Sequence, residues 1–216
     1  MGHITTKPCL VAFEGGVTDS LSFVRDAQEF MERIDPASDP TRIHIRRREL
    51  MAGLGLLRIQ VAWEIFLEDA FTRYMCGARS PSGYRPTLLS SAEKDIGSAC
   101  SRLLGSQRFL SWSALKANER AQEYFAEGEP FSTALSAVTH VLDEVNDIRN
   151  WFAHSSQYAA RQFQQVVRSH LGYVPRGMTV GRFLLTPVSG VEGSGWQFID
   201  LYGNLLLGSA RAIVRR

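Results

Sequence analysis

Apolar residues recur at steps of three and four along most of this chain, the spacing that places side chains on one face of an α-helix. The longest such pattern predicts a helix over residues 46–76. Apolar residues occupy two sides of it: Leu50, Leu54, Leu57, Val61 and Ile65 on the first, and Ile59, Trp63, Phe66 and Ala70 on the second. A helix that is apolar on two sides is expected to be largely buried, so this segment should form the central helix.

The same spacing predicts further helices over residues 17–34, 90–104, 112–126, 132–153 and 156–171. We expect Thr18 or Asp19 to cap the first of these helices and Gly172 to end the last. The sequence from Ser90 to Glu93 has the spacing of a capping box, which would start the second. The chain is therefore predicted to be all-α through residue 172.

The residues beyond 172 change character, because glycine, proline and β-branched residues interrupt the helical pattern. Segments 178–188 and 190–199 fit a short β-hairpin, and 198–214 fits a final helix that packs back on the bundle. The two interpretations overlap, and both stay open. The expected organisation is an N-terminal helix and linker over 1–42, an antiparallel helical bundle over 43–172 and a C-terminal extension over 173–216.

Candidate chemistry lies near the end of the helix predicted over 132–153, in the sequence Asp147-Ile148-Arg149-Asn150-Trp151-Phe152-Ala153-His154. Arg149 is always charged, and its planar guanidinium would hold and neutralise a phosphate. His154 can accept and release a proton near neutral pH. Asn150 lies four residues before His154 and Asp147 three before Asn150, so the three share a face, where Asn150 would orient the imidazole or the substrate. Together they would permit a ribose 2′-hydroxyl to attack the adjacent phosphate.

Arg149 and His154 do not form one tight stripe, because a step of five residues leaves them roughly 140° apart around an ideal helix. A site that uses both needs a local distortion of the helix or a second subunit that places its own copy nearby. A purely structural interpretation is also open. Arginine and histidine near a helix C-terminus interact favourably with the helix dipole and with unpaired carbonyl groups.

Two segments together carry a family resemblance. One is Arg149-Asn150 followed by His154, and the other is Trp63-Glu64-Ile65-Phe66-Leu67-Glu68-Asp69. The first is similar to the Arg-(polar)-x3-His signature of the HEPN superfamily of small helical domains, and the second is similar to a stretch in the first main helix of prokaryotic HEPN families of the RiboL-PSP type. The resemblance covers about residues 43 to 171. It implies a HEPN-like antiparallel bundle, a metal-independent ribonuclease with Arg149 and His154 as catalytic residues, and a two-fold dimer with a composite active site.

Glu64 and Glu68 are four residues apart and share a helical face. One of them, with Glu64 as the first candidate, would pair with Arg149 or His154 and fix its orientation or pKa. The alternative is a solvated acidic edge or a structural partner for Arg58 or Arg73. Trp63, in the same segment, is expected to belong to the core.

Arginines cluster at the start of the central helix, at Arg42, Arg46, Arg47 and Arg48. A helix N-terminus disfavours cations unless an anion lies close by. An RNA backbone would be one such anion, which makes the last three arginines candidate RNA-binding residues. Acidic neighbours such as Asp35 and Asp39 are the alternative.

The composition limits the kinds of protein this chain could be without identifying its function. A net charge of +2 gives no general affinity for nucleic acid, and no run approaches the roughly 18 apolar residues of a membrane span. Cys9, Cys76 and Cys100 are odd in number and widely spaced, which favours reduced thiols. None of the five histidines has metal-ligand spacing to another. We therefore expect a cytoplasmic protein without membrane association, metal or other cofactor.

Two functions remain. The first is an endoribonuclease of HEPN type that leaves a 2′,3′-cyclic phosphate and acts as a toxin or phage-defence effector, with a cognate antitoxin or a defence-system protein as partner. The second is a non-catalytic helical module that binds RNA, a nucleotide or a protein partner through the same polar face, because a fold does not fix an activity.

Overall fold

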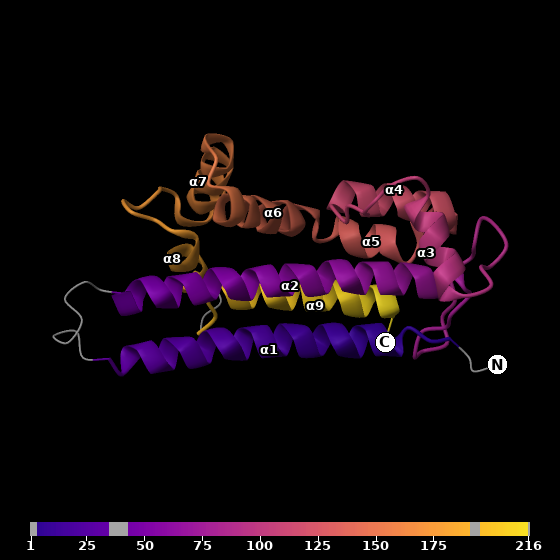
Figure 1. The fold of residues 1–216 in the computed structure, drawn as a ribbon, viewed down its shortest axis with the longest axis horizontal. Helices are drawn as coiled ribbons and strands as arrows, with labels where there is room; N and C mark the ends of the chain where they lie inside the picture. Colours follow the sequence, from indigo (N-terminus) through magenta and orange to yellow (C-terminus); the bar gives the residue numbers. More distant parts are fainter. Residues whose placement is uncertain (1–3, 35–42, 191–194, 216) are drawn as a thin grey trace. The chain divides into compact units, whose positions relative to one another are not determined.

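The computed structural model describes residues 4–34, 43–190 and 195–215. The long helices are α1 (Lys7–Glu32), α2 (Ile43–Met75), α6 (Thr139–His154), α7 (Gln157–Leu171) and α9 (Phe198–Val214). The shorter ones are α3 (Ile96–Leu104), α4 (Ala114–Tyr124), the 3₁₀ turn η2 (Ala126–Gly128), α5 (Phe131–Ser136) and α8 (Val180–Leu184) (Figure 1). No β-strand is assigned within these ranges, so the all-α prediction is confirmed.

The chain divides into two compact units, and each is described by itself. Unit 1 comprises Met1–Gly15, Val61–Leu142 and Leu205–Arg216, and unit 2 comprises Gly16–Gln60 and Asp143–Asn204. Helices α1, α2, α6 and α9 contribute residues to both units. The division into 1–42, 43–172 and 173–216 stays a prediction.

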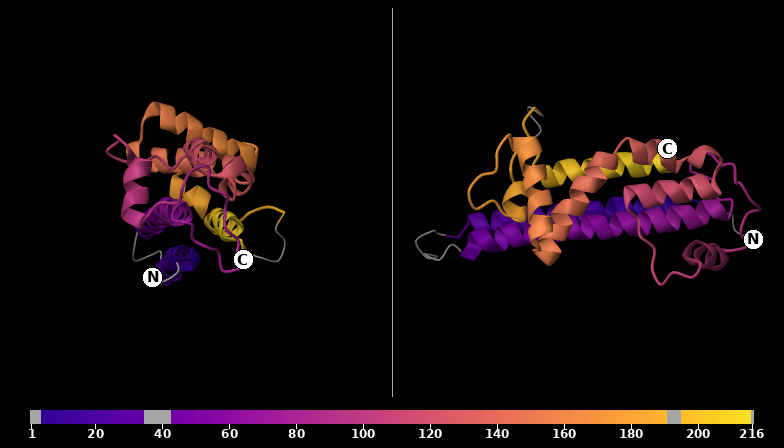
Figure 2. Two further views of the ribbon diagram at one scale, coloured as in Figure 1. Left: turned by 90° about the vertical axis from the view of Figure 1, so that its right-hand side faces the viewer. Right: turned by 90° about the horizontal axis from the view of Figure 1, so that it is seen from above.

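The core of unit 1 is rich in aromatic rings. Phe71 of α2 contacts Trp112, Phe125 and Phe131, with ring centroids 5.2, 5.4 and 3.9 Å away. Two further views show the short helices α3, α4 and α5 gathered beside this half of α2 (Figure 2). Trp63 is 2% exposed, which confirms that it belongs to the core.

Unit 2 is built on close approaches between α1, α2 and α9. A Cβ atom added at Gly55 of α2 would lie 2.5 Å from Val24 Cγ2 and 3.2 Å from Ile199 Cδ1. One at Gly203 of α9 would lie 3.3 Å from Val17 Cγ1. Small residues at these two positions therefore bring the three helices together.

Three predicted boundaries were wrong. Helix α1 begins at Lys7 rather than 17, because Leu10 and Phe13 extend its buried stripe upstream, so Thr18 and Asp19 lie inside the helix. Helix α3 begins at Ile96, where Asp95 accepts a hydrogen bond of 2.8 Å from the Ser98 amide and replaces the expected cap. The helix predicted over 132–153 is divided, with α5 ending at Ser136 and α6 beginning at Thr139.

The C-terminal extension contains the final helix and no hairpin strands within its described residues. Helix α9 forms over Phe198–Val214, as one interpretation predicted. Residues expected in the first hairpin strand form α8 instead, where the Thr179 side chain caps the Arg182 amide. A single antiparallel bridge, between Pro187 and Gln197, remains of the hairpin pattern.

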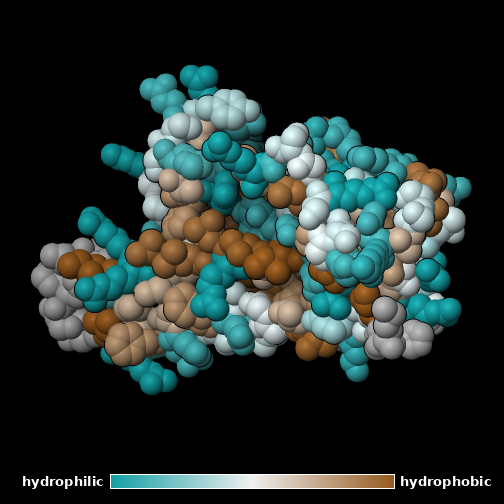
Figure 3. All heavy atoms as spheres, turned by 45° about the vertical axis from the view of Figure 1, so that its right-hand side comes forward, coloured by the Kyte–Doolittle hydropathy of each residue, from teal (hydrophilic) through white to brown (hydrophobic). Residues whose placement is uncertain are grey.

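Within the described residues, α2 is the one helix whose length and composition would allow it to cross a membrane. Its most apolar 18-residue window has a mean hydropathy of 1.5 and is 44% buried. The core helix of a soluble protein passes the same test, so this is weak evidence for a span. Apolar side chains do reach the surface (Figure 3), and on α2 these include Leu50, Leu54, Val61 and Ile65. The expectation that both apolar sides of this helix are buried is therefore wrong for the first side, whereas the second side is buried, at Ile59, Trp63, Phe66 and Ala70.

Candidate functional site

Helix α6 has the two faces that its sequence predicts. Val141, Val145 and Ile148 are buried on the apolar side. On the polar side, Asp143 and His154 are exposed and Asp147 and Asn150 are half-buried. The candidate residues are thus displayed toward the surface of unit 2 by a helix whose other face is fixed in a core.

A sharp corner follows His154. Ser155 has a φ of 48°, the left-handed conformation that usually ends a helix at glycine, and its amide donates a hydrogen bond of 3.1 Å to the Trp151 carbonyl. The Ser156 side chain then accepts from the Ala159 amide at 3.1 Å and starts α7. His154 therefore lies at the outer end of α6, immediately before the chain turns away.

Arg149 and Asn150 lie together. Arg149 Nη1 donates to Asn150 Oδ1 at 3.1 Å, and both side chains are half-buried. The Asn150 amide oxygen thus orients the guanidinium rather than the imidazole. Helix α6 continues to His154, so Arg149 and His154 keep their helical spacing of roughly 140°. Local distortion of the helix does not bring them together.

Asp147 has an environment that disfavours its charge. Burial raises its pKa above the usual value, and the charges of Asp143 and Glu144 raise it further. Three carboxylates lie within five residues here, so a cation near this part of α6 would be favoured. The supporting role predicted for Asp147 stays a prediction.

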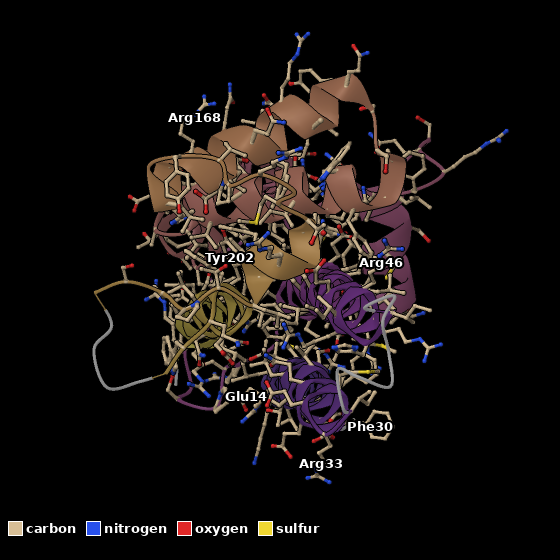
Figure 4. The ribbon with its side chains drawn as sticks, turned by 90° about the vertical axis from the view of Figure 1, so that its left-hand side faces the viewer. Glu14, Phe30, Arg33, Arg46, Arg168 and Tyr202 are labelled. Atoms are coloured by element: carbon tan, nitrogen blue, oxygen red, sulfur yellow. The ribbon has the colours of Figure 1, made fainter. Side chains whose placement is uncertain are left out.

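A polar cluster that the sequence did not predict joins three helices of unit 2. Tyr202 of α9 donates to Glu144 Oε2 at 2.9 Å, and His170 Nε2 of α7 lies 2.9 Å from the same oxygen. Tyr202 is 1% exposed and lies in the interior, whereas Arg168 of α7 points outward (Figure 4). Burial raises the pKa of Tyr202, so its hydroxyl remains a donor. His170 therefore has a carboxylate partner.

A pocket of about 430 Å³ adjoins the end of α6 in unit 2. Trp151, Phe152 and Ser155 line one side of it, and Arg46 of α2 lines another. Arg46 is exposed at the edge of α2 (Figure 4). The pocket therefore places Arg46, from the predicted RNA-binding cluster, beside Trp151 and Ser155. These two residues directly follow Asn150 and His154 in the chain.

The other arginines of the cluster have different surroundings. Arg47 is exposed and does not line the pocket, and Arg48 lies 3.8 Å from Glu32 at the end of α1. Arg42, like the acidic residues Asp35 and Asp39, lies outside the described residues. Among the three described arginines of the cluster, Arg46 is therefore the one that shares a pocket with residues of α6.

Two glycines shape the walls of this pocket. A Cβ atom at Gly53 of α2 would lie 2.2 Å from Cε2 of the Phe152 ring, and one at Gly181 of α8 would lie 1.9 Å from the Glu49 carbonyl oxygen. Thr179 also donates to Glu49 Oε2 at 2.7 Å. These contacts hold α6 and α8 against α2. The sequence does contain a glycine within the central helix and a tryptophan within the motif. Neither residue indicates which other segment it lies against in the fold.

Glu64 and Glu68 belong to unit 1, whereas Arg149 and His154 belong to unit 2. Glu64 lines a separate pocket of about 570 Å³ there. Glu68 lines it as well, and its Oε2 accepts from Trp112 Nε1 at 3.3 Å. The pairing of either glutamate with the motif stays a prediction.

Across the described ranges, no group of three or more His, Cys, Asp or Glu residues is arranged to hold a metal ion. The three cysteines are free thiols. No protein-family model matches this chain, and no curated protein and no solved structure matches it either.

Proposed function

We propose that this protein is a metal-independent endoribonuclease of HEPN type. The ribose 2′-oxygen would attack the adjacent phosphorus and expel the 5′-oxygen, which leaves a 2′,3′-cyclic phosphate. Arg149 would stabilise the charge on the phosphate oxygens, and His154 would transfer the proton. The observation that carries the proposal is the pocket beside α6, where Arg46 lies close to Trp151 and Ser155. A cationic side chain there would hold an RNA backbone next to the catalytic residues.

The proposal requires two copies of the chain. Arg149 and His154 project from different sides of a continuous α6, so one copy does not direct both at a single phosphate. In a two-fold dimer, Arg149 of one protomer would face the same cleft as His154 of its partner. We propose this composite site for the homodimer.

The cellular role that goes with this activity is that of a cytoplasmic toxin or phage-defence effector. An RNase that acts on cellular RNA requires restraint, so we also propose an antitoxin or a defence-system protein as its partner. The resemblance of Arg149, Asn150 and His154 to the HEPN signature supports this role.

The test is incubation of the purified protein with total tRNA and a labelled single-stranded RNA in excess EDTA. Wild type is compared with Arg149→Ala and His154→Ala. His140→Ala, at an exposed histidine of the same helix, and Arg161→Ala, at an exposed arginine of α7, are the matched controls. We expect cleavage by wild type and both controls, a cyclic phosphate on the product, and no cleavage by either motif variant.

Other outcomes contradict the proposal in distinct ways. Cleavage that EDTA abolishes would point to a metal-dependent reaction. Cleavage that survives in His154→Ala would place the site elsewhere. Intact RNA at high protein concentration would favour the non-catalytic module, in which Arg149 contributes to binding alone.

A further inference from the structure

The pocket beside α6 has the walls of a site for a flat apolar ring. Trp151, Phe152, Leu50 and Val180 line it, and their side chains are aromatic or aliphatic. Its volume of about 430 Å³ falls within the range of roughly 300–1,000 Å³ typical of small-molecule sites. Trp151 is half-buried, and the part of a tryptophan ring that lines a pocket can stack on the bases of RNA, which all have a flat π surface.

The pocket lining carries one cation, Arg46, and one carboxylate, Glu49, which accepts a hydrogen bond from Thr179. Arg46 lines it as an exposed cation, and a guanidinium binds phosphate oxygens through paired donors. An aromatic side chain for the base beside an arginine for the backbone is the usual combination in proteins that bind single-stranded nucleic acid.

Two walls of the pocket pack closely against α2. The Phe152 ring packs against the backbone of Gly53, and Gly181 packs against the backbone of Glu49. Neither contact leaves room for a methyl group, so α6 and α8 cannot move closer to α2.

We propose that this pocket is a nucleobase subsite, which takes one unstacked base of single-stranded RNA with Trp151 as its stacking surface and Arg46 on the adjoining phosphate. This inference rests on the proposed ribonuclease function, because it names the class of RNA that the site accepts. Bases in a duplex are stacked and paired, so the pocket selects single-stranded RNA, loops and bulges. Trp151 lies next to Asn150 in the chain, so the captured base belongs to a nucleotide close to the phosphate that is attacked.

The experiment measures binding without cleavage. The probe is a fluorescent 2′-O-methyl hexanucleotide, which has no 2′-hydroxyl to attack, and anisotropy gives its affinity. An abasic residue is then placed at each position in turn. We expect one position at which loss of the base weakens binding to wild type about ten-fold. If no abasic position weakens binding, the inference is overturned.

Variants assign that effect to the pocket. Trp151→Leu should bind the intact probe about ten-fold more weakly and lose the abasic effect, whereas Trp151→Phe should retain most of both. Trp196→Leu, at a tryptophan outside the pocket, should match wild type. An abasic effect that is equally large in Trp151→Leu would place the base elsewhere. Thermal unfolding checks each variant, and the abasic scan on wild type decides the matter if Trp151→Leu does not fold.

Arg46→Ala provides a second, independent measurement. It should weaken binding of intact and abasic probes by the same factor and reduce the slope of log affinity against log salt by about one. The matched control is Arg161→Ala, whose slope should equal that of wild type. An unchanged slope in Arg46→Ala would overturn the phosphate contact.

The binding assay and the cleavage assay test different proposals, so either proposal can be overturned without the other. Cleavage without an abasic effect would leave the ribonuclease proposal standing and overturn the base subsite. An abasic effect that depends on Trp151, in a protein that never cleaves RNA, would support the subsite and overturn the ribonuclease.

Discussion

Replacing Gly53 or Gly181 with alanine tests the close packing that forms the pocket. At Gly53 the new methyl would lie 2.2 Å from Cε2 and 2.7 Å from Cδ2 of the Phe152 ring. At Gly181 it would lie 1.9 Å from the Glu49 carbonyl oxygen, which is main chain and cannot rotate away. All three distances are far below van der Waals contact, so the Phe152 ring must tilt in the first variant and the α8 backbone must shift in the second.

The expected change in the free energy of unfolding is the difference between two opposing effects. Alanine favours a helix over glycine by about 1 kcal/mol, and overpacking a core costs about 1–3 kcal/mol. The Phe152 ring can tilt, so Gly53→Ala should lower the free energy of unfolding by about 1 kcal/mol after both effects. The Glu49 backbone cannot yield in this way, so Gly181→Ala should lower it by about 2 kcal/mol.

Two other glycines are matched controls. Gly15 in α1 and Gly208 in α9 are helical, and an added Cβ would meet nothing within 4 Å at either. Gly15→Ala and Gly208→Ala should therefore raise the free energy of unfolding by about 0.5–1 kcal/mol each.

The assay is urea denaturation followed by circular dichroism, with thermal unfolding as a second measurement. For a chain of this length, 1 kcal/mol corresponds to a shift in Tm of about 2–4 °C. The expected order of stability is Gly208→Ala and Gly15→Ala above wild type, then Gly53→Ala, then Gly181→Ala. If all four variants were stabilised alike, the contacts of Gly53 and Gly181 would not be as described, and the close packing of the pocket walls would be refuted.

Three further predictions concern single side chains. Tyr202→Phe removes a donor from Glu144 and should lower the free energy of unfolding by about 1–3 kcal/mol in urea titrations; equal stability would contradict the bond. The pKa of Asp147 is raised above 3.8, so wild type loses stability relative to Asp147→Asn as the pH rises through the folded-state pKa. Urea titrations should therefore show the variant to be more stable at pH 7 and equally stable below about pH 3.8. A difference in stability that does not change with pH would refute the reasoning. Cys9 is 3% exposed and burial raises its pKa to about 12, so iodoacetamide at pH 8 should modify it only in denaturant, as peptide mass spectrometry would detect.

Periodicity located the long helices, although it missed the first ten residues of α1 and the break between α5 and α6. It predicted the central helix over 46–76, which forms as Ile43–Met75, and it predicted the helix that Gly172 ends. It also predicted the two faces of α6. A stripe of this kind depends only on local spacing, and burial of one face is enough to stabilise the helix that carries it.

Contacts between segments that are distant in the chain could not be predicted from the sequence. Glu144 is a charged residue beside an apolar stripe, but nothing local indicates that Tyr202, 58 residues further on, donates to it. Gly53 and Gly181 likewise have no pattern that identifies Phe152 and Glu49 as their neighbours. Such pairings depend on how helices cross, and single-sequence periodicity does not contain that information.

Chain turns were predicted least well. The capping box at Ser90 and Glu93 has the right spacing, yet the Glu93 carboxylate pairs with Arg102 at 2.6 Å instead. The hairpin prediction was wrong because the short helix α8, capped by Thr179, occupies residues of the predicted first strand. Side chains that can bond to nearby backbone groups or to other side chains make such turns hard to predict from local spacing.

The bonds to Glu144 decide more than stability. Apolar packing tolerates small rotations of a helix about its own axis, because a buried methyl group accepts contact from many directions. The Glu144 carboxylate is different, since Tyr202 of α9 and His170 of α7 approach it along defined directions. These two bonds fix the angle at which α6 is set in unit 2. The directions in which Arg149 and His154 leave the helix are therefore determined by a glutamate that need never touch a substrate.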